Sequence, residues 1–311
     1  MKKDIIVKSV NISLEKGTIK KTTDTAEITE QGIKGDAHAG AWHRQISMLG
    51  TESIEKFSAM AKRGISYGEF AENITTEGML LYHALPLDTF ENKDIVLQVT
   101  QIGKECHGSK CAIFNEVGNC VMPKEGIFCR VLQGGKLKAG DKLTYKPRPF
   151  TFHVITLSDR ASKGIYDDRS GPRIIKHVKS FYADTNRPVY ITHTIIPDKE
   201  EDLALHIQKS VAVDTDFIIT TGGTGIGPRD ITTDVVKPLL EKEIPGIMEM
   251  VRVKYGMQKP NAFLSRSVAG TIQKTCLFTL PGSLKAVDEY MNELPQFFNH
   301  LIYTLYELDF H

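Results

Sequence analysis

The stretch with the clearest chemical meaning is a glycine-rich loop within residues 220–235, which follows an apolar run typical of a buried strand. Its glycines are Gly222, Gly223, Gly225 and Gly227, with Thr224 between them. Glycine accepts positive φ angles and close backbone approach, so successive amide groups of this loop can converge on an anion. We expect Thr232 or Thr233 to cap a following helix, whose N-terminus would add donors. The spacing predicts a phosphate-binding loop.

An acid, Asp230, closes the same loop. A carboxylate repels phosphate, so its position suggests a bridging divalent cation, and Mg²⁺ is the ion that most often links carboxylates to phosphates. The loop lacks the Gly-Lys-Ser/Thr ending of a P-loop, and its glycine spacing differs from the dinucleotide fingerprint. Taken alone, a Gly-Gly-Thr-Gly turn is also typical of a plain strand-to-helix connection.

The elements that must position this loop alternate between strand and helix after residue 150. We predict strands at 154–157, 189–196, 217–220 and 275–280, and helices near 171–183, 200–213, 232–241 and 283–306. Apolar strands separated by helices indicate an α/β three-layer sandwich with a mainly parallel sheet covered on both faces. Ligands of such sheets bind beyond the carboxyl ends of the strands.

Four polar loops are expected at that rim of the sheet. They are Ser158–Ser162, Pro197-Asp198, the glycine loop and Pro281-Gly282-Ser283. None contains histidine or cysteine, so a reaction there would have to proceed without these nucleophiles. Transfer of a nucleotidyl group to an ionised phosphate meets that condition, because catalysis then reduces to alignment and charge neutralisation. Asp198 and Asp230 suit the metal.

The same motifs, in this order, resemble those of molybdopterin adenylyltransferases of the MogA/MoaB type. The likeness covers residues 151 to about 305 and includes Ser158-Asp-Arg-Ala-Ser, Ile196-Pro-Asp198, the glycine loop, Ser265-Arg266 and Leu280-Pro-Gly282. It implies that ATP and Mg²⁺ adenylylate the terminal phosphate of molybdopterin, usually in a homotrimer. By the same likeness Asp198 and Asp230 are the catalytic, metal-binding acids. The remaining implied cofactor-binding residues are Ser158, Asp159, Gly222, Gly223, Thr224, Gly225, Glu249, Ser265, Pro281, Gly282 and Ser283.

The first half of the chain has a different pattern. Short alternating segments at 5–10, 46–49, 95–99 and 127–132, with one helix from about Thr51 to Gly64, predict a mostly β fold that closes as a small barrel. Two prolines spaced by one residue, Pro147 and Pro149, continue neither a helix nor a central strand. We therefore place the boundary there, with domains at 1–147 and 148–311.

Motifs of this half resemble the MOSC domain. They include Gly35-Asp-Ala-His-Ala-Gly40, Trp42-His-Arg-Gln45 and Thr100-Gln-Ile-Gly-Lys-Glu-Cys106, within residues 5–146. The likeness implies a β-barrel-like domain that binds, carries or sulfurates the molybdenum cofactor. It also places His38, His43 and Arg44 in a pocket that meets an anionic cofactor. The alternative is that these histidines only bond backbone around a bend.

Four of the five cysteines, Cys106, Cys111, Cys120 and Cys129, lie close together in the sequence. A thiolate at Cys106 could accept sulfur as a persulfide or ligate molybdenum. Zinc binding with His107 is an alternative, although the spacing fits paired zinc knuckles poorly. Inert buried thiols are a further alternative.

Composition excludes some classes of protein. Residues 1–150 carry 21 Lys and Arg against 18 Asp and Glu, and the rest carries 18 against 20, so we expect no nucleic-acid partner. The start lacks a signal-peptide core and no apolar run reaches membrane-spanning length, which favours a cytoplasmic protein. Other proteins of the cofactor pathway are the expected partners. A non-catalytic pterin carrier and a molybdate-inserting enzyme remain alternatives to adenylyl transfer.

Overall fold

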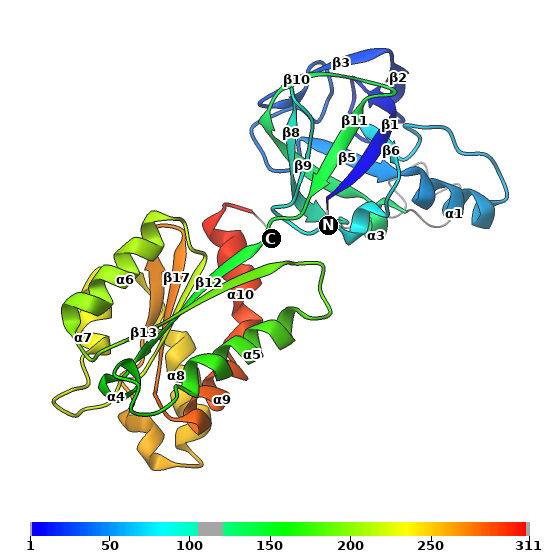
Figure 1. Cartoon of the computed structure of the whole chain (residues 1–311). Helices are drawn as coiled ribbons and strands as arrows, with labels where there is room; N and C mark the ends of the chain where they lie inside the picture. Colours follow the sequence, from blue (N-terminus) through cyan, green and yellow to red (C-terminus); the bar gives the residue numbers. More distant parts are fainter. Residues whose placement is uncertain (1, 105–120, 309–311) are drawn as a thin grey trace. The chain divides into compact units, whose positions relative to one another are not determined.

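The computed structural model describes residues 2–104 and 121–308 of the chain. The chain folds as two compact units that divide between Arg148 and Pro149 (Figure 1). The first unit is built mainly from strands, and the second alternates strands with helices.

Seven strands of the first unit close into a barrel, as predicted. Their order around the barrel is β1 (Lys3–Ile12), β11 (Lys142–Lys146), β7 (Thr89–Glu91), β8 (Val96–Ile102), β9 (Ile127–Gln133), β5 (Ile46–Gly50) and β6 (Ile74–Glu77), which returns to β1. The β5–β6 pairing is parallel and the others are antiparallel. Closure gives each of these strands a partner on both sides. A further short strand, β2 (Lys21–Thr23), pairs with the end of β1.

A small three-stranded sheet completes the strands of this unit. It contains β10 (Gly135–Lys138), β3 (Thr25–Thr29) and β4 (Gly32–Ile33). Alternation along β3 directs Ile28 into the barrel core, and β1 alternates up to Val7. A register shift between Val7 and Ser9 in the β1–β6 pairing then brings Val10 into the same core. Period-two alternation gives such strands one buried face, and the pairing of β1 with β11 closes the barrel around it.

Helix α1 (Thr51–Ala61) packs Ile54 and Phe57 into a second cluster of the barrel unit. The predicted cap at Thr51 was wrong: Gly50 is the N-cap, no side chain caps the helix, and Thr51 is its buried first residue. The described residues of this unit also form two shorter elements, η1 (Leu81–His83) and α3 (Met122–Glu125).

The second unit contains a six-stranded sheet. Its order is β13 (Val189–Ile196), β12 (Phe150–Leu157), β14 (Phe217–Thr221), β17 (Thr275–Leu280), β16 (Ala269–Ile272) and β15 (Lys242–Glu243). The first four strands are parallel to one another, which confirms the mainly parallel sheet. Strand β16 pairs antiparallel with β17, and β15 pairs antiparallel with β16. The carboxyl ends of β12, β13, β14 and β17 therefore meet at one rim.

Helices cover both faces of this sheet (Figure 1). Residues of α6 (Glu200–Ala212) and α7 (Thr232–Val236) join strand residues in one apolar layer. On the other face lie α5 (Ser170–Tyr182), α9 (Leu284–Met291) and α10 (Pro295–Leu305). There Phe298 of α10 packs on Phe152 and Phe217, with ring centroids 5.7 and 4.7 Å apart.

Two helix predictions need correction, and one helix was not predicted. The helix predicted at 232–241 ends at Val236, because a 3-10 turn, η3 (Lys237–Leu239), with Pro238 in it follows. The helix predicted at 283–306 divides into α9 and α10, with Pro295 starting the second. Helix α8 (Pro245–Gly256) was not predicted: its opening Pro-Gly resembles a turn, but proline is well tolerated at the first helical position.

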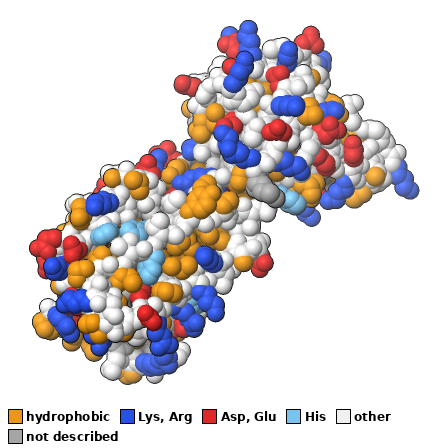
Figure 2. Space-filling model, viewed as in Figure 1, with side chains coloured by type: hydrophobic (Ala, Val, Ile, Leu, Met, Phe, Trp, Pro, Cys, Tyr) orange, Lys and Arg blue, Asp and Glu red, His pale blue; other side chains and the backbone are white. Residues whose placement is uncertain are grey.

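The short elements α4 (Asp159–Ser162) and η4 (Pro260–Leu264) complete the second unit. In the part of the chain that the structure describes, no helix is both long and apolar enough to cross a membrane. On the face shown in Figure 2, acidic and basic side chains are interspersed, in keeping with a formal net charge of +1.

Candidate nucleotide and metal site

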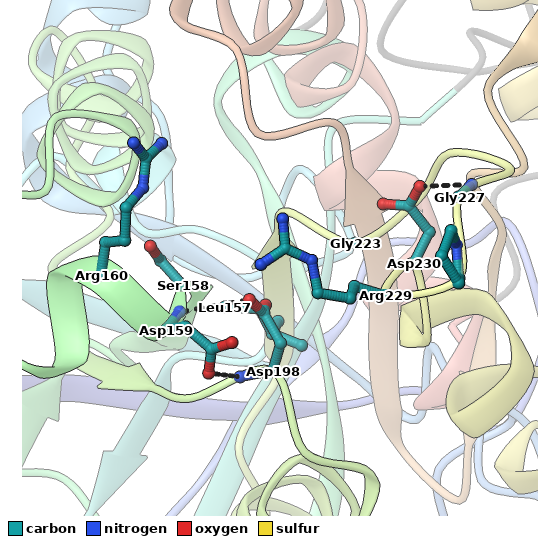
Figure 3. A pocket seen from close by; sticks show the side chains of 10 residues that line it. Leu157, Ser158, Asp159, Arg160, Asp198, Gly223, Gly227, Arg229 and Asp230 are labelled. Carbon is teal, nitrogen blue, oxygen red and sulfur yellow. Dashed lines mark hydrogen bonds between the residues drawn. The ribbon is translucent and has the colours of Figure 1, made fainter.

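A cavity of about 320 Å³ lies at the carboxyl rim of the sheet in the second unit (Figure 3). It is lined by Leu157, Ser158, Asp159, Arg160, Asp198, Gly223, Gly227, Pro228, Arg229 and Asp230. The strands that deliver these residues are β12, β13 and β14, which are neighbours in the sheet. The structure thus brings both predicted acids, Asp198 and Asp230, to one cavity.

Asp159 and Asp198 hold each other in place. The Asp159 amide donates to Asp198 Oδ2 at 3.1 Å, and the Asp198 amide donates to Asp159 Oδ1 at 3.2 Å. Each carboxylate keeps a second oxygen that accepts no hydrogen bond from the described residues. These two oxygens are available to a cation or to ligand hydroxyl groups.

Ser158 begins α4 beside these acids. Its Oγ accepts from the Ala161 amide at 3.2 Å and lies 2.9 Å from the Tyr166 hydroxyl, while the Arg160 guanidinium stands 5.0 Å from the Tyr166 ring centroid. Ser158 is therefore a helix cap as well as a lining residue, and the cap sets the direction in which Asp159 and Arg160 leave the strand.

The glycine loop begins with two residues in left-handed backbone conformations, Gly222 at φ +103° and Gly223 at φ +63°. A Cβ atom on Gly222 would lie 2.5 Å from the Leu157 carbonyl oxygen. Thr232 fastens the loop from behind, since its hydroxyl donates to the Gly222 carbonyl at 2.8 Å. The predicted capping role of the threonines was wrong: Ile231 is the N-cap of α7, and Thr233 bonds the Arg266 carbonyl.

Gly225 and Gly227 serve a different purpose from the first two glycines. Neither has a positive φ; instead, a Cβ atom on either residue would come within 2.6 or 3.0 Å of Asp230 Oδ2. That oxygen accepts from the Gly227 amide at 2.8 Å. The small residues therefore let the Asp230 carboxylate fold back against its own loop.

Arg266 orients the loop, and the sequence analysis did not include it among the site residues. Its amide donates to the Thr224 carbonyl at 2.8 Å, and its guanidinium donates to the carbonyls of Gly225 and Asp230 at 3.0 and 3.1 Å. A further ion pair joins it to Asp234. The only signal in the sequence was its place in the Ser265-Arg266 motif.

Because Arg266 gathers these carbonyl groups, the loop amides are left for another acceptor. In the described structure, the amides of Gly223, Thr224 and Gly225 donate to no protein group. Successive amides without protein partners form the kind of concave donor set that binds phosphate oxygens. The loop geometry therefore fits a polyphosphate.

The residues implied to seat the pterin lie outside the cavity lining. Gly282 touches the glycine loop, since its Cβ would stand 3.3 Å from Gly222 Cα, and the Pro281 carbonyl accepts from Thr221 at 3.0 Å. Ser283 caps α9. Ser265 accepts from the Tyr290 hydroxyl at 3.1 Å. Glu249 is exposed on α8 and is not among the lining residues.

The donor set of the cavity fits Mg²⁺ held in part by its substrate. Within residues 2–104 and 121–308, no three acidic, histidine or cysteine side chains form a metal-binding group. Mg²⁺ commonly takes only one or two carboxylates from the protein and completes its shell with phosphate oxygens and water. Asp198 and Asp230 are suitable for that arrangement.

The implied MOSC residues lie in the loops at one end of the barrel. The His38 amide donates to Asp36 Oδ1 at 3.0 Å, and its carbonyl accepts from Trp42 Nε1 at 2.8 Å. The His43 carbonyl accepts from Thr100 Oγ1 at 2.6 Å. The Arg44 guanidinium stands 5.0 Å from the Trp42 ring centroid. In these contacts the backbone groups of the two histidines hold the bend, and the imidazole rings take no part.

The cysteines divide into two groups. Cys106, Cys111 and Cys120, with His107, lie outside the described residues. Cys129 and Cys276 are fully buried, and burial raises the pKa of both thiols far above the usual range. Cys129 packs against Met48, with 3.7 Å between the sulfur atoms. These two thiols are structural.

Comparisons with known proteins match the two halves of the chain to two different families. Residues 153–300 match the family described as probable molybdopterin binding domain, and residues 35–144 match the MOSC domain. Over 156 residues the chain is 37% identical to molybdenum cofactor biosynthesis protein B of Staphylococcus aureus (strain COL), covering 49% of this chain and 89% of that protein.

Two further relatives cover the same half of the chain. Gephyrin of Dictyostelium discoideum is 38% identical over 142 residues, which span 44% of this chain and 20% of gephyrin. The chain therefore spans only about a fifth of gephyrin's length. The solved structure of the tungsten cofactor synthesizing protein MoaB from Pyrococcus furiosus aligns with a TM-score of 0.46 and 32% identity, over 52% of this chain and 100% of that one.

The range matched to the MOSC domain contains His38 and Arg44, and the range matched in the second half contains Asp198, Asp230 and the other cavity residues. The chain therefore joins an N-terminal MOSC domain to a C-terminal domain of the molybdenum cofactor biosynthesis protein B family, and it belongs to molybdenum cofactor biosynthesis.

Proposed function

We propose that the C-terminal domain transfers AMP from ATP to the phosphate of molybdopterin in a Mg²⁺-dependent reaction. The observation that carries this proposal is the cavity itself: Asp198 and Asp230 line it together with the glycine loop, in which the amides of Gly223, Thr224 and Gly225 donate to no group of the described residues. Acids alone would suit a metal site, and amides alone would suit an anion. Together they suit a metal-bound nucleotide.

Each group in the cavity has a role in this reaction. Asp198 and Asp230 would hold Mg²⁺, which would neutralise charge on the triphosphate. Gly223 lines the cavity, and its amide, with those of the following Thr224 and Gly225, would bind phosphate oxygens; Arg160 and Arg229 add positive charge to the lining. Asp159 fixes Asp198 through the paired hydrogen bonds.

The chemical step needs no protein nucleophile. An oxygen of the molybdopterin phosphate attacks the α-phosphorus of ATP, a new phosphorus–oxygen bond forms, and the bond to pyrophosphate breaks with pyrophosphate as the leaving group. The attacking phosphate is already ionised at neutral pH, so no general base is required. Alignment and charge neutralisation then supply the catalysis.

The pterin would lie on the side of the loop where Gly282 touches Gly222. By family likeness Ser265 and the turn at 281–283 would seat the pterin, and Glu249 would be a further cofactor-binding residue. We also propose that the C-terminal domain forms a homotrimer, as domains of this type usually do.

For the N-terminal domain we propose that it binds, carries or sulfurates the cofactor. Cys106 would carry the sulfur or ligate molybdenum, and His38, His43 and Arg44 would meet the anionic cofactor. Other proteins of the pathway would supply the sulfur or receive the product.

The test uses the full chain with molybdopterin, ATP and Mg²⁺, followed by mass spectrometry for the AMP adduct. We expect the adduct with wild-type protein and a loss of at least a hundredfold in rate with Asp230→Asn or Asp198→Asn. Asp214→Asn is the matched control. This exposed acid precedes β14 and so lies toward the amino ends of the strands, away from the cavity, and its φ of +54° also suits asparagine.

Two results would contradict the proposal. If wild-type protein binds the pterin tightly but forms no adduct, the domain is a carrier. If the adduct forms equally well with both acid variants, these carboxylates do not hold the metal.

A further inference from the structure

The 281–283 turn is held by two hydroxyl groups that come from different elements. Thr221 Oγ1, at the end of β14, donates to the Pro281 carbonyl at 3.0 Å. Ser170 Oγ, at the start of α5, donates to the Gly282 carbonyl at 2.8 Å. Ser170 is buried and was not among the site residues expected from the sequence. Two successive carbonyl groups of the turn are therefore fixed.

These two bonds determine the direction of the neighbouring amides. In a planar trans peptide the C=O and N–H groups point in opposite directions, so the Gly282 amide points away from Thr221 and the Ser283 amide away from Ser170. Both turn residues are exposed, and neither amide donates to a group of the described residues. A Cβ atom on Gly282 would stand 3.3 Å from Gly222 Cα. Two adjacent donors are thus available to a ligand beside the glycine loop.

Ser170 is held in turn by Asp168, whose side chain is almost fully buried. Asp168 Oδ1 accepts from the Ser170 amide at 2.8 Å. Its Oδ2 accepts from the Thr156 hydroxyl of β12 at 2.8 Å and lies 3.0 Å from His193 Nε2 of β13. A Cβ atom on Gly171 would overlap His193 Nε2 and come within 2.6 Å of Asp168 Oδ2, so α5 begins directly against this pair. Asp168 therefore ties the first residue of α5 to two strands of the sheet.

Other contacts already hold α5 against α9. Arg173 of α5 donates to both carboxylate oxygens of Asp288 of α9 at 2.6 and 2.9 Å, and His177 Nε2 lies 2.7 Å from the same carboxylate. These contacts join the two helices independently of the turn. The Ser170 hydroxyl is thus best explained by the one group that it holds, the Gly282 carbonyl.

We propose that Ser170 and Asp168 are positioning residues for the pterin. Asp168 fixes the first residue of α5, and the Ser170 hydroxyl fixes the 281–283 turn so that the amides of Gly282 and Ser283 face the pterin. Molybdopterin offers acceptors to such amides in its ring carbonyl and in its phosphate. The inference rests on the proposed transfer of AMP to molybdopterin and adds two residues that support the turn from behind.

The first test measures steady-state AMP transfer by the full chain carrying Ser170→Ala. We expect the KM for molybdopterin to rise about tenfold while kcat and the KM for ATP stay near the wild-type values, because the change loosens the contacts of one substrate only. A purely structural role would instead lower kcat through loss of folded protein and leave both KM values unchanged.

Arg173→Met is the matched control for this test. It breaks the partly exposed contact with Asp288 between the same two helices and leaves the Ser170 hydroxyl in place. Its KM for molybdopterin should equal that of the wild type.

A double-mutant cycle tests whether Asp168 acts through Ser170. Asp168→Ala should raise the KM for molybdopterin in the same direction as Ser170→Ala. The double variant should be no worse than Asp168→Ala alone, because both changes act on one hydrogen bond. Fully additive effects would show that Asp168 does not act through Ser170.

A further measurement needs no catalysis. Molybdopterin is titrated into the full chain without ATP, and hydrogen exchange of the segment that contains residues 281–283 is followed by mass spectrometry. We expect the pterin to protect this segment in the wild type, and Ser170→Ala to need about tenfold more pterin for the same protection.

The proposal is overturned if Ser170→Ala changes neither the KM for molybdopterin nor the exchange titration. It is also overturned if Arg173→Met raises that KM equally, since the effect would then belong to helix packing. Failure of the proposed catalysis is seen separately: wild-type protein would form no AMP adduct, and the exchange titration would still compare Ser170→Ala with the wild type.

Discussion

Replacing Gly222 by alanine tests whether the glycine loop owes its shape to the missing side chain. Gly222 has φ +103°, and its Cβ would lie 2.5 Å from the Leu157 carbonyl oxygen. A left-handed backbone costs a residue other than glycine about 1–2 kcal/mol. The carbonyl cannot easily yield, because β12 is paired on both sides, so overpacking adds about 1–3 kcal/mol. The total is about 2–5 kcal/mol.

The loss of stability can be measured in the second domain separately from the first. For a domain of this size, about 2–4 °C of Tm per kcal/mol predicts a fall of roughly 4–20 °C in the second domain. Far-UV circular dichroism at the helix band follows that domain, which holds most of the helices. Trp42 is the only tryptophan and lies in the barrel, so its fluorescence transition should not move.

Gly164→Ala is the matched control. Gly164 also has a positive φ, +68°, in the second domain, but no atom lies within 4 Å of its Cβ position. It should cost only the backbone strain, about 1–2 kcal/mol. If Gly222→Ala destabilises no more than Gly164→Ala, the close approach to Leu157 has no energetic weight and the reasoning fails. AMP transfer should fall with Gly222→Ala and stay unchanged with Gly164→Ala.

Three further predictions follow from single contacts. Arg266→Lys should lower the rate of AMP transfer at least tenfold with little change in the Tm of the ATP-free protein, because lysine cannot donate to the Gly225 and Asp230 carbonyls at the same time. An unchanged rate would remove Arg266 from the site. Burial, then the neighbouring His206 and His193, lowers the pKa of His153 to about 4, so up to about 3 kcal/mol of stability present above pH 6.5 should be lost as the pH falls toward 4. His153→Gln should flatten that profile in urea titrations. Cys129 and Cys276 should resist a thiol reagent in the native protein and react after unfolding; rapid native labelling at either would contradict their burial.

The loop itself was predictable from the sequence because its contacts are local. Gly225, Gly227 and Asp230 interact across at most five positions, and the spacing of small residues around an acid records that geometry directly. The barrel and the parallel sheet were predictable for a similar reason, since residue alternation and apolar runs mark strands one by one.

Arg266 shows what local pattern could not reveal. It lies 36 positions beyond Asp230 and reaches the loop because it lies just before β16, whose antiparallel pairing with β17 places its first residues at the carboxyl ends of β14 and β17. Nothing in its own neighbourhood distinguishes it from a surface arginine.

By itself the sequence determined the two kinds of fold, the glycine-rich loop and the acid that closes it, because those depend on residues close together in the chain. The tertiary structure decided that Asp159 and Asp198 hold each other, that Arg266 bonds the Gly225 and Asp230 carbonyls, and that Lys20 pairs with Asp36 in the interior. These contacts join separate loops whose meeting depends on strand order. Strand order is set by how the whole core packs, and no single segment encodes it.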